Sequence, residues 1–496
     1  MAARNLLAFD LGAESGRALL GRLDGGKITL EEKHRFANPN GRLNGHLCWN
    51  LLAQWEELKN GLRKAGAGGG PIHAIGVDTW GVDVGFLDKD GDPVASPYMY
   101  RDPQTDGMMD LAFSRVPKAE MFERTGVQFM QLNTVFHLLA MTQRKSAILD
   151  AARTMLFMPD LFNYLFTGEK VAELSIATTS QMYDPRAGAW ATGMLDKLGI
   201  PTHFLPKIVP TGTRLANVRS DVARECGITA EIPVIATAGH DTAAAVAAVP
   251  VDASDGPDWC YISSGTWSLM GVEVREPIIN ARSLALNYTN EGGVGGTIRF
   301  LKNIMGLWLV QECRRQWVKE GRELSYAELT RMAAESDPFI AAVDPDDRPF
   351  ITPGEMPRKI AEFCARTNQR APGTPGEYVR VCLESLALTY RKTIDGLEDV
   401  LGRKINVIHI VGGGTQNELL SQMTADATGK LVVAGPVEAT AVGNMGVTAM
   451  AAGEIGSVEE LRAVVRRSFP LKRYEPTKDR GGWDEAYGKY KGLTRA

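Results

Sequence analysis

Residues 6–17 read "LLAFDLGAESGR", an apolar run that passes directly into a turn of small, polar and glycine residues. Three later segments repeat this design: "IHAIGVDTWG" (72–81), "WCYISSGTWS" (259–268) and "VIHIVGGGTQN" (407–417). A short apolar run followed by turn residues predicts a buried strand. Because long helical patterns lie between these strands, the sequence predicts an α/β fold.

The first and third segments indicate an internal duplication. Each is followed at once by a second apolar stretch, "ALLGRL" (18–23) and "LMGV" (269–272), as in a β-hairpin. We therefore expect two similar lobes with a cleft between them. The stretch "PVDASDGPD" (250–258), rich in Pro, Asp and Gly, is the expected hinge and divides the chain into residues 1–249 and 250–496.

Two stretches have the 3.6-residue period of helices that pack against a core. In the first stretch the residues that follow this period are Val379, Leu383, Leu386, Tyr390, Ile394, Leu397 and Leu401. In the second, near the C-terminus, they are Trp483, Ala486, Tyr487 and Tyr490. We interpret the second as a packing stripe rather than a binding site, because large apolar side chains are usually buried.

Length and charge restrict the possible functions. At 496 residues the chain exceeds one core and indicates two or three domains. The net charge is −4 and no block of like charge occurs, so binding to nucleic acid or to a membrane surface has no support from composition. Any phosphate recognition must therefore be local, and the sequence does not indicate an oligomeric state.

The six cysteines are scattered without a CxxC pair: Cys48, Cys226, Cys260, Cys313, Cys364 and Cys382. This pattern argues against a zinc site and favours reduced thiols, with a Cys364–Cys382 bridge as the alternative. The N-terminal sequence enters the first predicted strand without the features of a signal peptide. No run approaches the roughly 18 apolar residues of a membrane span, so we expect a cytoplasmic protein.

The first turn can bind phosphate. Its backbone N–H groups can point at phosphate oxygens, while Asp10 can hold a magnesium ion and Arg17 can offset phosphate charge. The alternative is an ordinary hairpin turn in which Gly12 and Gly16 supply positive φ angles. The similar turn "SSGTWS" (263–268) favours the phosphate interpretation, because two such turns can hold a polyphosphate from both sides.

Two glycine-rich segments differ in what they indicate. In "VGGGTQN" (411–417) the absence of side chains after a strand would let a ligand ring lie flat. The chain contains neither a Walker A motif nor GxGxxG here, which excludes the P-loop and Rossmann interpretations. The run "GGVGGT" (292–297) is equally consistent with a flexible turn.

The stretch "ATAGHDTAAAVA" (236–247) places a carboxylate between an apolar strand and an alanine-rich helix. One interpretation is an N-cap. The other is a general base, since ligands of open α/β sheets bind at the carboxyl ends of strands. The helix dipole would lower the pKa of Asp241 and keep it ionised. Both interpretations are compatible if Thr242 and the backbone cap the helix.

A sugar pocket is indicated by two further segments. "GVDTWGVD" (76–83) and "YMYRD" (98–102) combine a tryptophan beside a glycine with carboxylates and an arginine. An aromatic face and charged groups suit a carbohydrate, although a buried core tryptophan with surface charges is the competing interpretation. The stretch 299–317 predicts an amphipathic helix that carries Asn303 near its start, where it would bind a sugar hydroxyl or cap the helix.

Taken together, the motifs resemble those of the FGGY family of carbohydrate kinases, which have the duplicated actin-like ATPase (ribonuclease H-like) fold. The similarity extends from about residue 5 to about residue 470. It is carried by "DLGAESGR", "IGVDTWGVD", "FMPDLFNYLFTG", "GHDTA", "ISSGTWSLMG", "TNEGG", "LKNIMGLW", "IHIVGGGTQNELLSQMTADATG" and "AGPVEATAVGN". The generic family signature with Lys and Trp is absent, and "FMPDLFNYLFTG" stands in its place.

The resemblance implies phosphorylation of a ketose by ATP with Mg²⁺, the first lobe holding the sugar and the second the nucleotide. It implies nucleotide contacts from Ala13, Glu14, Ser15, Gly16, Arg17, Thr266, Gln311 and Gly413. It implies sugar contacts from Gly81, His240, Asp241, Thr242 and Asn303, with Asp241 as proton acceptor and Asp10 beside the metal. Glu14 replaces the small residue that is common in the first loop, so we expect its side chain to turn away from phosphate.

The ketose that the resemblance favours is L-rhamnulose, phosphorylated at its 1-hydroxyl, with L-fuculose or another ketose as the alternative. A different class also fits the fold: an actin- or chaperone-like ATPase whose nucleotide state controls a protein partner. The predicted sugar-binding set of Trp80, Gly81, Arg101 and Asn303 argues against that class, because a pure ATPase has no use for it.

Overall fold

The segment that opens the sequence folds into the predicted hairpin. Strand β1 (Arg4–Leu11) pairs antiparallel with β2 (Ser15–Asp24), and the register sets Asp10 opposite Arg17. On its other side β1 pairs in parallel with β6 (Ala74–Thr79). The carboxyl end of β1 therefore lies beside the carboxyl end of β6.

The same arrangement recurs later in the chain, which confirms the predicted duplication and the α/β class. Strand β15 (Trp259–Ser264) pairs antiparallel with β16 (Trp267–Val274) and in parallel with β19 (Val407–Val411). Each half thus opens on a hairpin whose first strand also has a parallel neighbour, as expected for a duplicated actin-like fold.

The computed structural model describes residues 3–67 and 70–494, which form two compact units. The first unit comprises the chain up to Ala248, Glu273–Phe300 and Ala439–Phe469. The second comprises Val249–Val272, Leu301–Glu438 and the chain from Pro470 onward. The chain first changes unit beside the predicted boundary at residue 249, and two later segments return to the first unit without any signal in the sequence.

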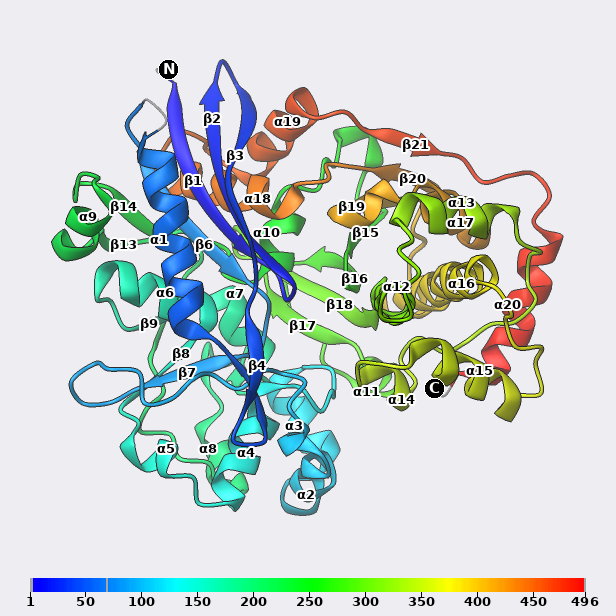
Figure 1. Ribbon diagram of the computed structural model, residues 1–496, viewed down its shortest axis with the longest axis horizontal. Helices are drawn as coiled ribbons and strands as arrows, with labels where there is room; N and C mark the ends of the chain where they lie inside the picture. The colour runs from blue at the N-terminus through cyan, green and yellow to red at the C-terminus, as the bar shows by residue number, and fades with distance from the viewer. Residues whose placement is uncertain (1–2, 68–69, 495–496) are drawn as a thin grey trace. The chain divides into compact units, whose positions relative to one another are not determined.

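The first unit is built on a sheet with the strand order β13-β14-β6-β1-β2-β3, which is completed by β13 (Thr213–Asn217), β14 (Pro233–Ala236) and β3 (Lys27–Ala37). Its two faces are covered by α1 (Leu51–Ala67) and α18 (Ala439–Ala451), which Figure 1 shows beside β1. Ala18 packs near Gly61 of α1, whereas Gly21 packs against Met445 of α18. Because strand residues alternate in direction, this offset of three positions puts the helices on opposite faces.

The first unit contains a large apolar core. Its members include Phe122, Phe136, Phe157 and Leu195, all buried. The remaining elements of this unit are β4 (Asn40–Leu43), β5 (His46–Trp49), β7 (Val84–Leu87), η1 (Pro103–Thr105), α2 (Met108–Arg115), α3 (Lys118–Thr125), α4 (Thr134–Gln143), α5 (Ala147–Ala151), β8 (Thr154–Phe157), α6 (Met158–Thr167), β9 (Val171–Glu173), α7 (Leu174–Ala177), η2 (Thr178–Ser180), β10 (Tyr183–Asp184), β11 (Ala189–Trp190), α8 (Thr192–Leu198), β12 (Lys207–Val209), α9 (Ser220–Cys226), α10 (Asp241–Ala247), α11 (Ala281–Ala285), β17 (Thr289–Gly292) and α19 (Val458–Ser468).

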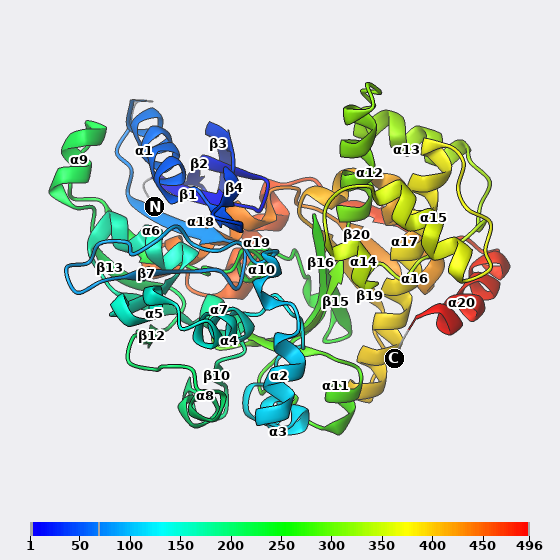
Figure 2. The same cartoon turned by 60° about the horizontal axis from the view of Figure 1, so that its bottom comes forward.

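Most strands of the other large sheet, whose order is β17-β18-β16-β15-β19-β20-β21, belong to the second unit, whereas β17 belongs to the first. Helices α16 and α17 pack together in the second unit, as Figure 2 shows. The remaining elements of the chain are η3 (Ala253–Asp255), β18 (Ile298–Met305), α12 (Trp308–Lys319), α13 (Tyr326–Glu335), α14 (Arg348–Ile351), α15 (Met356–Arg366), α16 (Pro375–Leu401), η4 (Gly413–Gln416), α17 (Glu418–Thr428), β20 (Leu431–Ala434), β21 (Lys472–Tyr474) and α20 (Gly481–Leu493).

One predicted helix is wrong in its first half. Residues 298–305 form strand β18, and helix α12 begins only at Trp308. The sheet decides the conformation here, because β18 fills the position between β17 and β16. Asn303 is therefore a strand residue and does not cap a helix.

The predicted packing faces are confirmed. Along α16 the periodic residues from Val379 to Leu397 are buried, and Trp483, Tyr487 and Tyr490 of α20 are buried as well, whereas Leu401 and Ala486 are only half-buried. All six cysteines are free thiols, so Cys364 and Cys382 form no bridge. Among the described residues, every helix is too short or too polar to cross a lipid bilayer.

Helices α10 and α18 make an unusually close contact at Gly443. A Cβ atom built on this glycine would lie 1.7 Å from the carbonyl oxygen of Ala244, which is a backbone atom and cannot rotate away. Because α10 carries Asp241 in its first turn, the missing side chain at Gly443 sets the position of that helix.

We predict that Gly443→Ala lowers the free energy of unfolding by about 1–3 kcal/mol, the usual cost of overpacking a core. The matched control is Gly488→Ala in α20, where a Cβ would meet no described atom within 4 Å and alanine favours the helix. Thermal unfolding of both variants, followed by circular dichroism, checks the prediction. Equal midpoints for the two would contradict it.

Candidate active site

The polar turn between β14 and α10 lies at the carboxyl end of a parallel strand. Strand β14 pairs in parallel with β6, and the pairing continues beyond both strands in a parallel bridge between Thr79 and His240. Helix α10 begins at Asp241, directly after that bridge. Asp241 therefore occupies the position at which open α/β sheets bind their ligands.

Thr242 does not cap α10, contrary to the prediction. His240 occupies the N-cap position, and its side chain makes no cap hydrogen bond. The hydroxyl of Thr242 instead donates to Oδ1 of Asp241 at 3.2 Å. Thr242 thus acts on the carboxylate rather than on the helix end.

The expected lowering of the Asp241 pKa is also wrong. Burial raises the pKa of this carboxyl group, and Asp10 adds to the effect, while His240 and the hydrogen bonds from Thr242 oppose it. The side chain keeps 32% of its exposed area. Contact with water therefore limits the rise, because solvent screens the charge. Burial therefore outweighs the favourable effect of the helix N-terminus here.

Glu173 holds the turn that carries Asp241. Its Oε2 accepts from the backbone N–H of Gly239 at 3.0 Å and from the Ser175 hydroxyl at 2.6 Å. Ser175 Oγ in turn accepts from the backbone N–H of His240 at 3.2 Å. Further bonds from Ser175 N and from Thr211 reach Oε1. The buried carboxylate thus connects β9 and α7 to the Gly-His-Asp-Thr turn.

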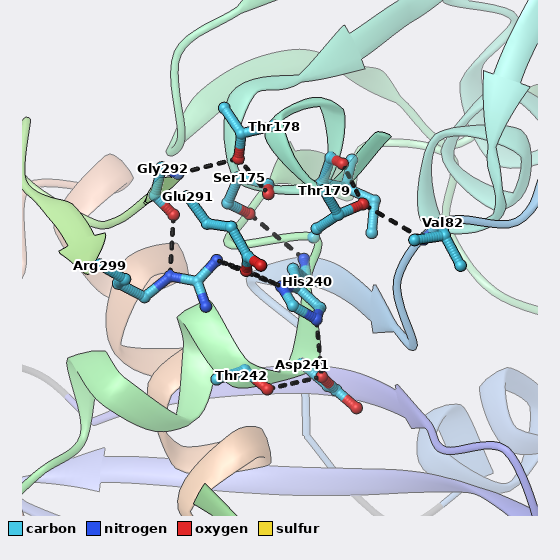
Figure 3. Close-up of polar contacts among 12 residues, drawn as sticks. Val82, Ser175, Thr178, Thr179, His240, Asp241, Thr242, Glu291, Gly292 and Arg299 are labelled. Atoms are coloured by element: carbon cyan, nitrogen blue, oxygen red, sulfur yellow. Dashed lines mark hydrogen bonds and ion pairs between the residues drawn. The ribbon is translucent and has the colours of Figure 1, made fainter. Parts of the chain in front are cut away.

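His240 lies between Asp241 and a buried ion pair, as Figure 3 shows. Its Nε2 is 3.4 Å from Asp241 Oδ1, and its Nδ1 is 3.3 Å from Glu291 Oε2 and 3.2 Å from Arg299 Nη2. Arg299 also pairs with Glu291 at 3.1 Å and donates from Nε to the carbonyl of Gly292 at 2.9 Å. The imidazole is therefore fixed from both sides.

Gly81 faces the imidazole of His240. A Cβ atom at Gly81 would lie 3.3 Å from His240 Nε2. The next residue, Val82, has a φ of 69°, which is rare for a β-branched side chain and costs about 1–3 kcal/mol. Hydrogen bonds with Thr179 and Thr134 hold it there. This strained turn, shown in part in Figure 3, fixes where Gly81 presents its backbone.

The tryptophan of the predicted sugar pocket is a core residue. Trp80 is 6% exposed and packs on Trp49 with ring centroids 4.2 Å apart. Both indole N–H groups donate to Oδ2 of Asp83, at 2.8 and 2.6 Å. Burial raises the pKa of Asp83 to about 7 in spite of these donors. The competing interpretation, a buried core tryptophan with surface charges, is thus right for the Trp80 ring. It is wrong for the Asp83 carboxylate, which is buried.

The other charged residues of that predicted pocket have separate roles. Asp102 is fully buried and accepts from the backbone N–H groups of Leu47 and Gln104, which makes it the cap of η1. Arg101 lies over the ring of Tyr100, 5.1 Å from its centroid. Asp102 is therefore a structural residue.

Asp10 and Asp78 form a pair of acidic residues on the neighbouring strands β1 and β6. Asp10 Oδ2 accepts from Arg17 Nη2 at 2.6 Å across the hairpin. The neighbour of Asp10 in the parallel register is Asp78, which is completely buried. Asn444 of α18 donates to Asp78 Oδ2 at 2.6 Å. Burial, followed by the charge of Asp10, raises the pKa of Asp78 well above its usual range.

The first phosphate-type turn is held by its carbonyl groups. Asn38 donates from its side chain to the carbonyl of Gly12 at 2.8 Å and from its backbone to that of Glu14 at 2.9 Å. Gln54 in turn donates to Asn38 Oδ1 at 2.6 Å. These hydrogen bonds fix both carbonyl groups of the turn. The Glu14 side chain is exposed.

The second turn has the same construction. The carbonyl of Thr266 accepts from Gly306 N at 3.1 Å and from Trp308 N at 3.2 Å, and that of Gly265 accepts from Leu307 N at 3.0 Å. The two turns are thus alike in backbone chemistry as well as in sequence.

The three glycines of the 411–417 segment have different surroundings. A Cβ at Gly412 would lie 3.0 Å from the Ser264 carbonyl oxygen, and one at Gly414 would lie 2.0 Å from Ser264 Oγ. At Gly413 a Cβ would meet no described atom within 4 Å. Close packing therefore explains two of the glycines, while Gly413 leaves open space beside its backbone.

The predicted residues fall into two groups. The first unit holds Asp10, Ala13–Arg17, Gly81 and His240–Thr242, and within it the structure brings Gly81, His240 and Asp241 together. The second unit holds Thr266, Asn303, Gln311 and Gly413. Gln311 lies in the first turns of α12, and its Oε1 is buried without a hydrogen-bond partner among the described residues.

Sequence reasoning missed the residues that support the site. Glu291 and Asn444 lie in stretches whose resemblance was noted, "TNEGG" and "AVGN", but without a role. Asn38, Glu173 and Arg299 lie outside any motif with a mechanism. A buried charge is invisible in one sequence, because its burial depends on strands that pair far along the chain.

Comparison with known proteins gives the class of protein first. The fold matches the gluconate kinase of Lactobacillus acidophilus with a TM-score of 0.80 at 15% identity, covering 99% of this chain and 98% of that one. It matches the glycerol kinase of Plasmodium falciparum with a TM-score of 0.77 at 14% identity, covering 99% and 97%. The fold is that of the actin-like sugar kinases.

The family follows from sequence. The N-terminal domain model of the FGGY family of carbohydrate kinases matches residues 5–248, and the C-terminal domain model matches residues 260–452. The rhamnulokinase of Bacteroides thetaiotaomicron is 43% identical over 99% of this chain and all of its own length. That of Bacillus subtilis is 37% identical over 95% of each chain. The chain belongs to the FGGY family and is an ATP-dependent carbohydrate kinase.

We predict that Asp83→Asn removes the fall in folding stability that the wild-type protein shows as the pH rises. A folded-state pKa near 7 means that the folded protein binds this proton more tightly than the unfolded chain, so wild-type stability falls as the pH rises from about 4 to about 7. Asparagine still accepts from both indoles and carries no charge. Relative to wild type, the variant should gain about 2 kcal/mol of unfolding free energy between pH 5 and pH 7.

Urea unfolding, followed by tryptophan fluorescence, measures this difference at each pH. The control is Asp90→Asn, at an exposed turn. A variant-minus-wild-type difference for Asp83→Asn that stays constant across this range would contradict the prediction.

Proposed function

We propose that this protein transfers the γ-phosphoryl group of ATP to the 1-hydroxyl of L-rhamnulose, forming L-rhamnulose 1-phosphate and ADP, in L-rhamnose catabolism. The relatives named rhamnulokinase, which match almost the whole chain, support this substrate. The observation that carries the chemistry is the carboxylate of Asp241, held by His240 and Thr242 beside Gly81.

Asp241 is the proposed proton acceptor. The Thr242 hydroxyl donates to Oδ1 and His240 Nε2 lies 3.4 Å from the same oxygen, which leaves Oδ2 to accept the proton of the sugar hydroxyl. As that proton leaves, the hydroxyl oxygen bonds to the γ-phosphorus and the bond from phosphorus to the bridging oxygen of ADP breaks. In a loose phosphoryl-transfer transition state, orientation of the hydroxyl contributes more than base strength.

The sugar-binding set that we propose is Gly81, His240, Asp241, Thr242 and Asn303. The absence of a side chain at Gly81 supports a close approach of the sugar to His240 Nε2. Asn303, which lies in β18, is proposed from its motif, "LKNIMGLW".

The nucleotide would be bound by backbone groups. We propose contacts from Ala13, Glu14, Ser15, Gly16 and Arg17 in the first turn and from Thr266 in the second. The fixed carbonyl groups of both turns support this, because they hold the backbone of each turn in one conformation. Open space beside Gly413 and the unpartnered Oε1 of Gln311 suit the rest of the nucleotide.

The donor set around Asp10 fits a magnesium ion. The ion typically uses one or two carboxylates and completes its coordination with phosphate oxygens and water. Among the described residues, no group of three or more acidic, His or Cys side chains forms a protein-only metal site. A magnesium ion bound by Asp10 would neutralise charge on the phosphates. Arg17, already paired with Asp10, would contribute a second positive charge.

An ADP-release assay across a ketose panel tests the substrate. We expect kcat/KM to be highest for L-rhamnulose among L-rhamnulose, L-fuculose, L-xylulose and D-fructose, since this ratio reports differential transition-state binding. A preference for L-fuculose would overturn the proposed substrate but keep the enzyme class. Basal hydrolysis of ATP that no sugar stimulates would instead favour the ATPase whose partner is a protein.

We predict that Asp241→Asn keeps ATP affinity and lowers kcat by about 10²–10⁴-fold, the usual contribution of a general base. The matched control is Asp221→Asn, which changes an exposed acid in the first turn of another seven-residue helix of the same unit, α9. Nucleotide titration and steady-state turnover separate the two effects. A turnover near that of wild type would exclude Asp241 as the base.

A further inference from the structure

The Arg299 side chain is a fully buried charge with three defined contacts. It is 0% exposed, lies on β18, and donates from Nε to the Gly292 carbonyl. Its Nη2 is 3.1 Å from Glu291 Oε2 and 3.2 Å from His240 Nδ1. Because an isolated buried charge is strongly unfavourable, the pairing with Glu291 is what allows arginine at this position.

The chemistry of arginine decides where the His240 proton lies. A guanidinium group has only donors, so an imidazole nitrogen in hydrogen-bond contact with it must present a lone pair. The hydrogen bond from Nη2 to His240 Nδ1 is compatible with the ion pair between Nη2 and Glu291 Oε2. With Nδ1 as acceptor, the single proton of the neutral imidazole must be on Nε2.

Nε2 faces the catalytic side of the ring. It lies 3.4 Å from Asp241 Oδ1 and 3.3 Å from the position that a Cβ of Gly81 would take. Glu291 alone would favour the opposite tautomer, because its Oε2 is 3.3 Å from Nδ1 and a carboxylate can only accept. The competition between Arg299 and Glu291 for Nδ1 therefore determines whether Nε2 donates to Asp241.

We propose that Arg299 is a positioning residue that holds His240 as the neutral Nε2–H tautomer, and that Glu291 is the counter-charge that retains Arg299 in the core. Arg299 acts through His240. The Nε2–H group then directs a donor at Oδ1 of Asp241, as the Thr242 hydroxyl does, and this orients Oδ2 toward the sugar hydroxyl. The inference rests on the proposed role of Asp241 but not on which ketose is the substrate.

The tautomer can be measured without any sugar. In protein labelled with ¹⁵N-histidine, long-range ¹H–¹⁵N correlation spectra distinguish a protonated from an unprotonated ring nitrogen. The signals of His240 are identified by their loss in His240→Asn. We expect Nε2 to be protonated and Nδ1 unprotonated at neutral pH. A protonated Nδ1 in the wild-type protein overturns the proposal without the need for any variant at Arg299.

A charge-removing variant tests the cause. In Arg299→Met, Glu291 is the remaining partner of Nδ1, so the tautomer should reverse and kcat should fall roughly 10- to 100-fold, as for loss of a residue that orients a catalytic group. KM for ATP should not change. Arg299→Lys keeps a donor beside Nδ1 and should restore the Nε2–H signal and most of the turnover.

The matched control is Arg462→Met. Arg462 is another buried arginine of the same unit, paired with Glu273, and it contacts the carbonyl of Val246 at the far end of α10. Its loss should lower stability without changing the His240 tautomer. If Arg299→Met and Arg462→Met reduce kcat equally and leave the tautomer unchanged, Arg299 is merely structural and the proposal fails. If no ketose is turned over, the proposed substrate fails while the tautomer result stands.

Discussion

The parallel pairing of β14, β6 and β1 is the constraint on which the site depends. In a parallel sheet the carboxyl ends of all strands meet at one edge. Asp10 is the last residue but one of β1, Asp78 is its neighbour on β6, and the bridge from Thr79 to His240 extends the pairing into the turn that carries Asp241. Residues separated by more than 200 positions in the sequence thus share one edge because of backbone hydrogen bonds alone.

Buried charges hold this edge in one arrangement. Glu173, Asp78 and Asp83 are each at least 96% buried, and all three accept hydrogen bonds from named donors. Burial raises the pKa of every one of them, which means that each destabilises the folded state when it is ionised. Alternative packings would leave these groups without donors at a still higher cost. The polar network therefore favours a single geometry at the expense of stability.

The sequence predicted what is local and missed what is long-range. The hairpins, the parallel strands, the long helix α16 and the turn before α10 follow from periodicity and turn residues within some 20 positions of each other. The second half of the predicted 299–317 helix is right, but its first half is a strand, because sheet pairing overrides an amphipathic pattern. The sequence predicts a capping role for Thr242, because neither the contact of Thr242 with Asp241 nor the burial of that turn can be seen in one sequence.

The supporting residues were beyond prediction for a related physical reason. Glu173, Glu291 and Arg299 are charged residues that a sequence pattern assigns to the surface. Their burial follows from the way in which β9, β17 and β18 pack beside the turn, and each has a partner on a distant segment. Only Glu291 lies in a motif that resemblance had marked, and the resemblance gave it no role.

Two opposing effects act on the basicity of the Asp241 carboxylate. Burial makes this carboxylate a stronger proton acceptor, whereas the donors on Oδ1 stabilise the ionised form and weaken it as a base. Under the proposed mechanism, positioning of the hydroxyl matters more than basicity, because the transition state of phosphoryl transfer is loose. The balance therefore favours donors that fix one oxygen. This accounts for three layers of support, from Glu173 on the backbone, from Thr242 on the carboxylate and from Arg299 through His240, around a single aspartate.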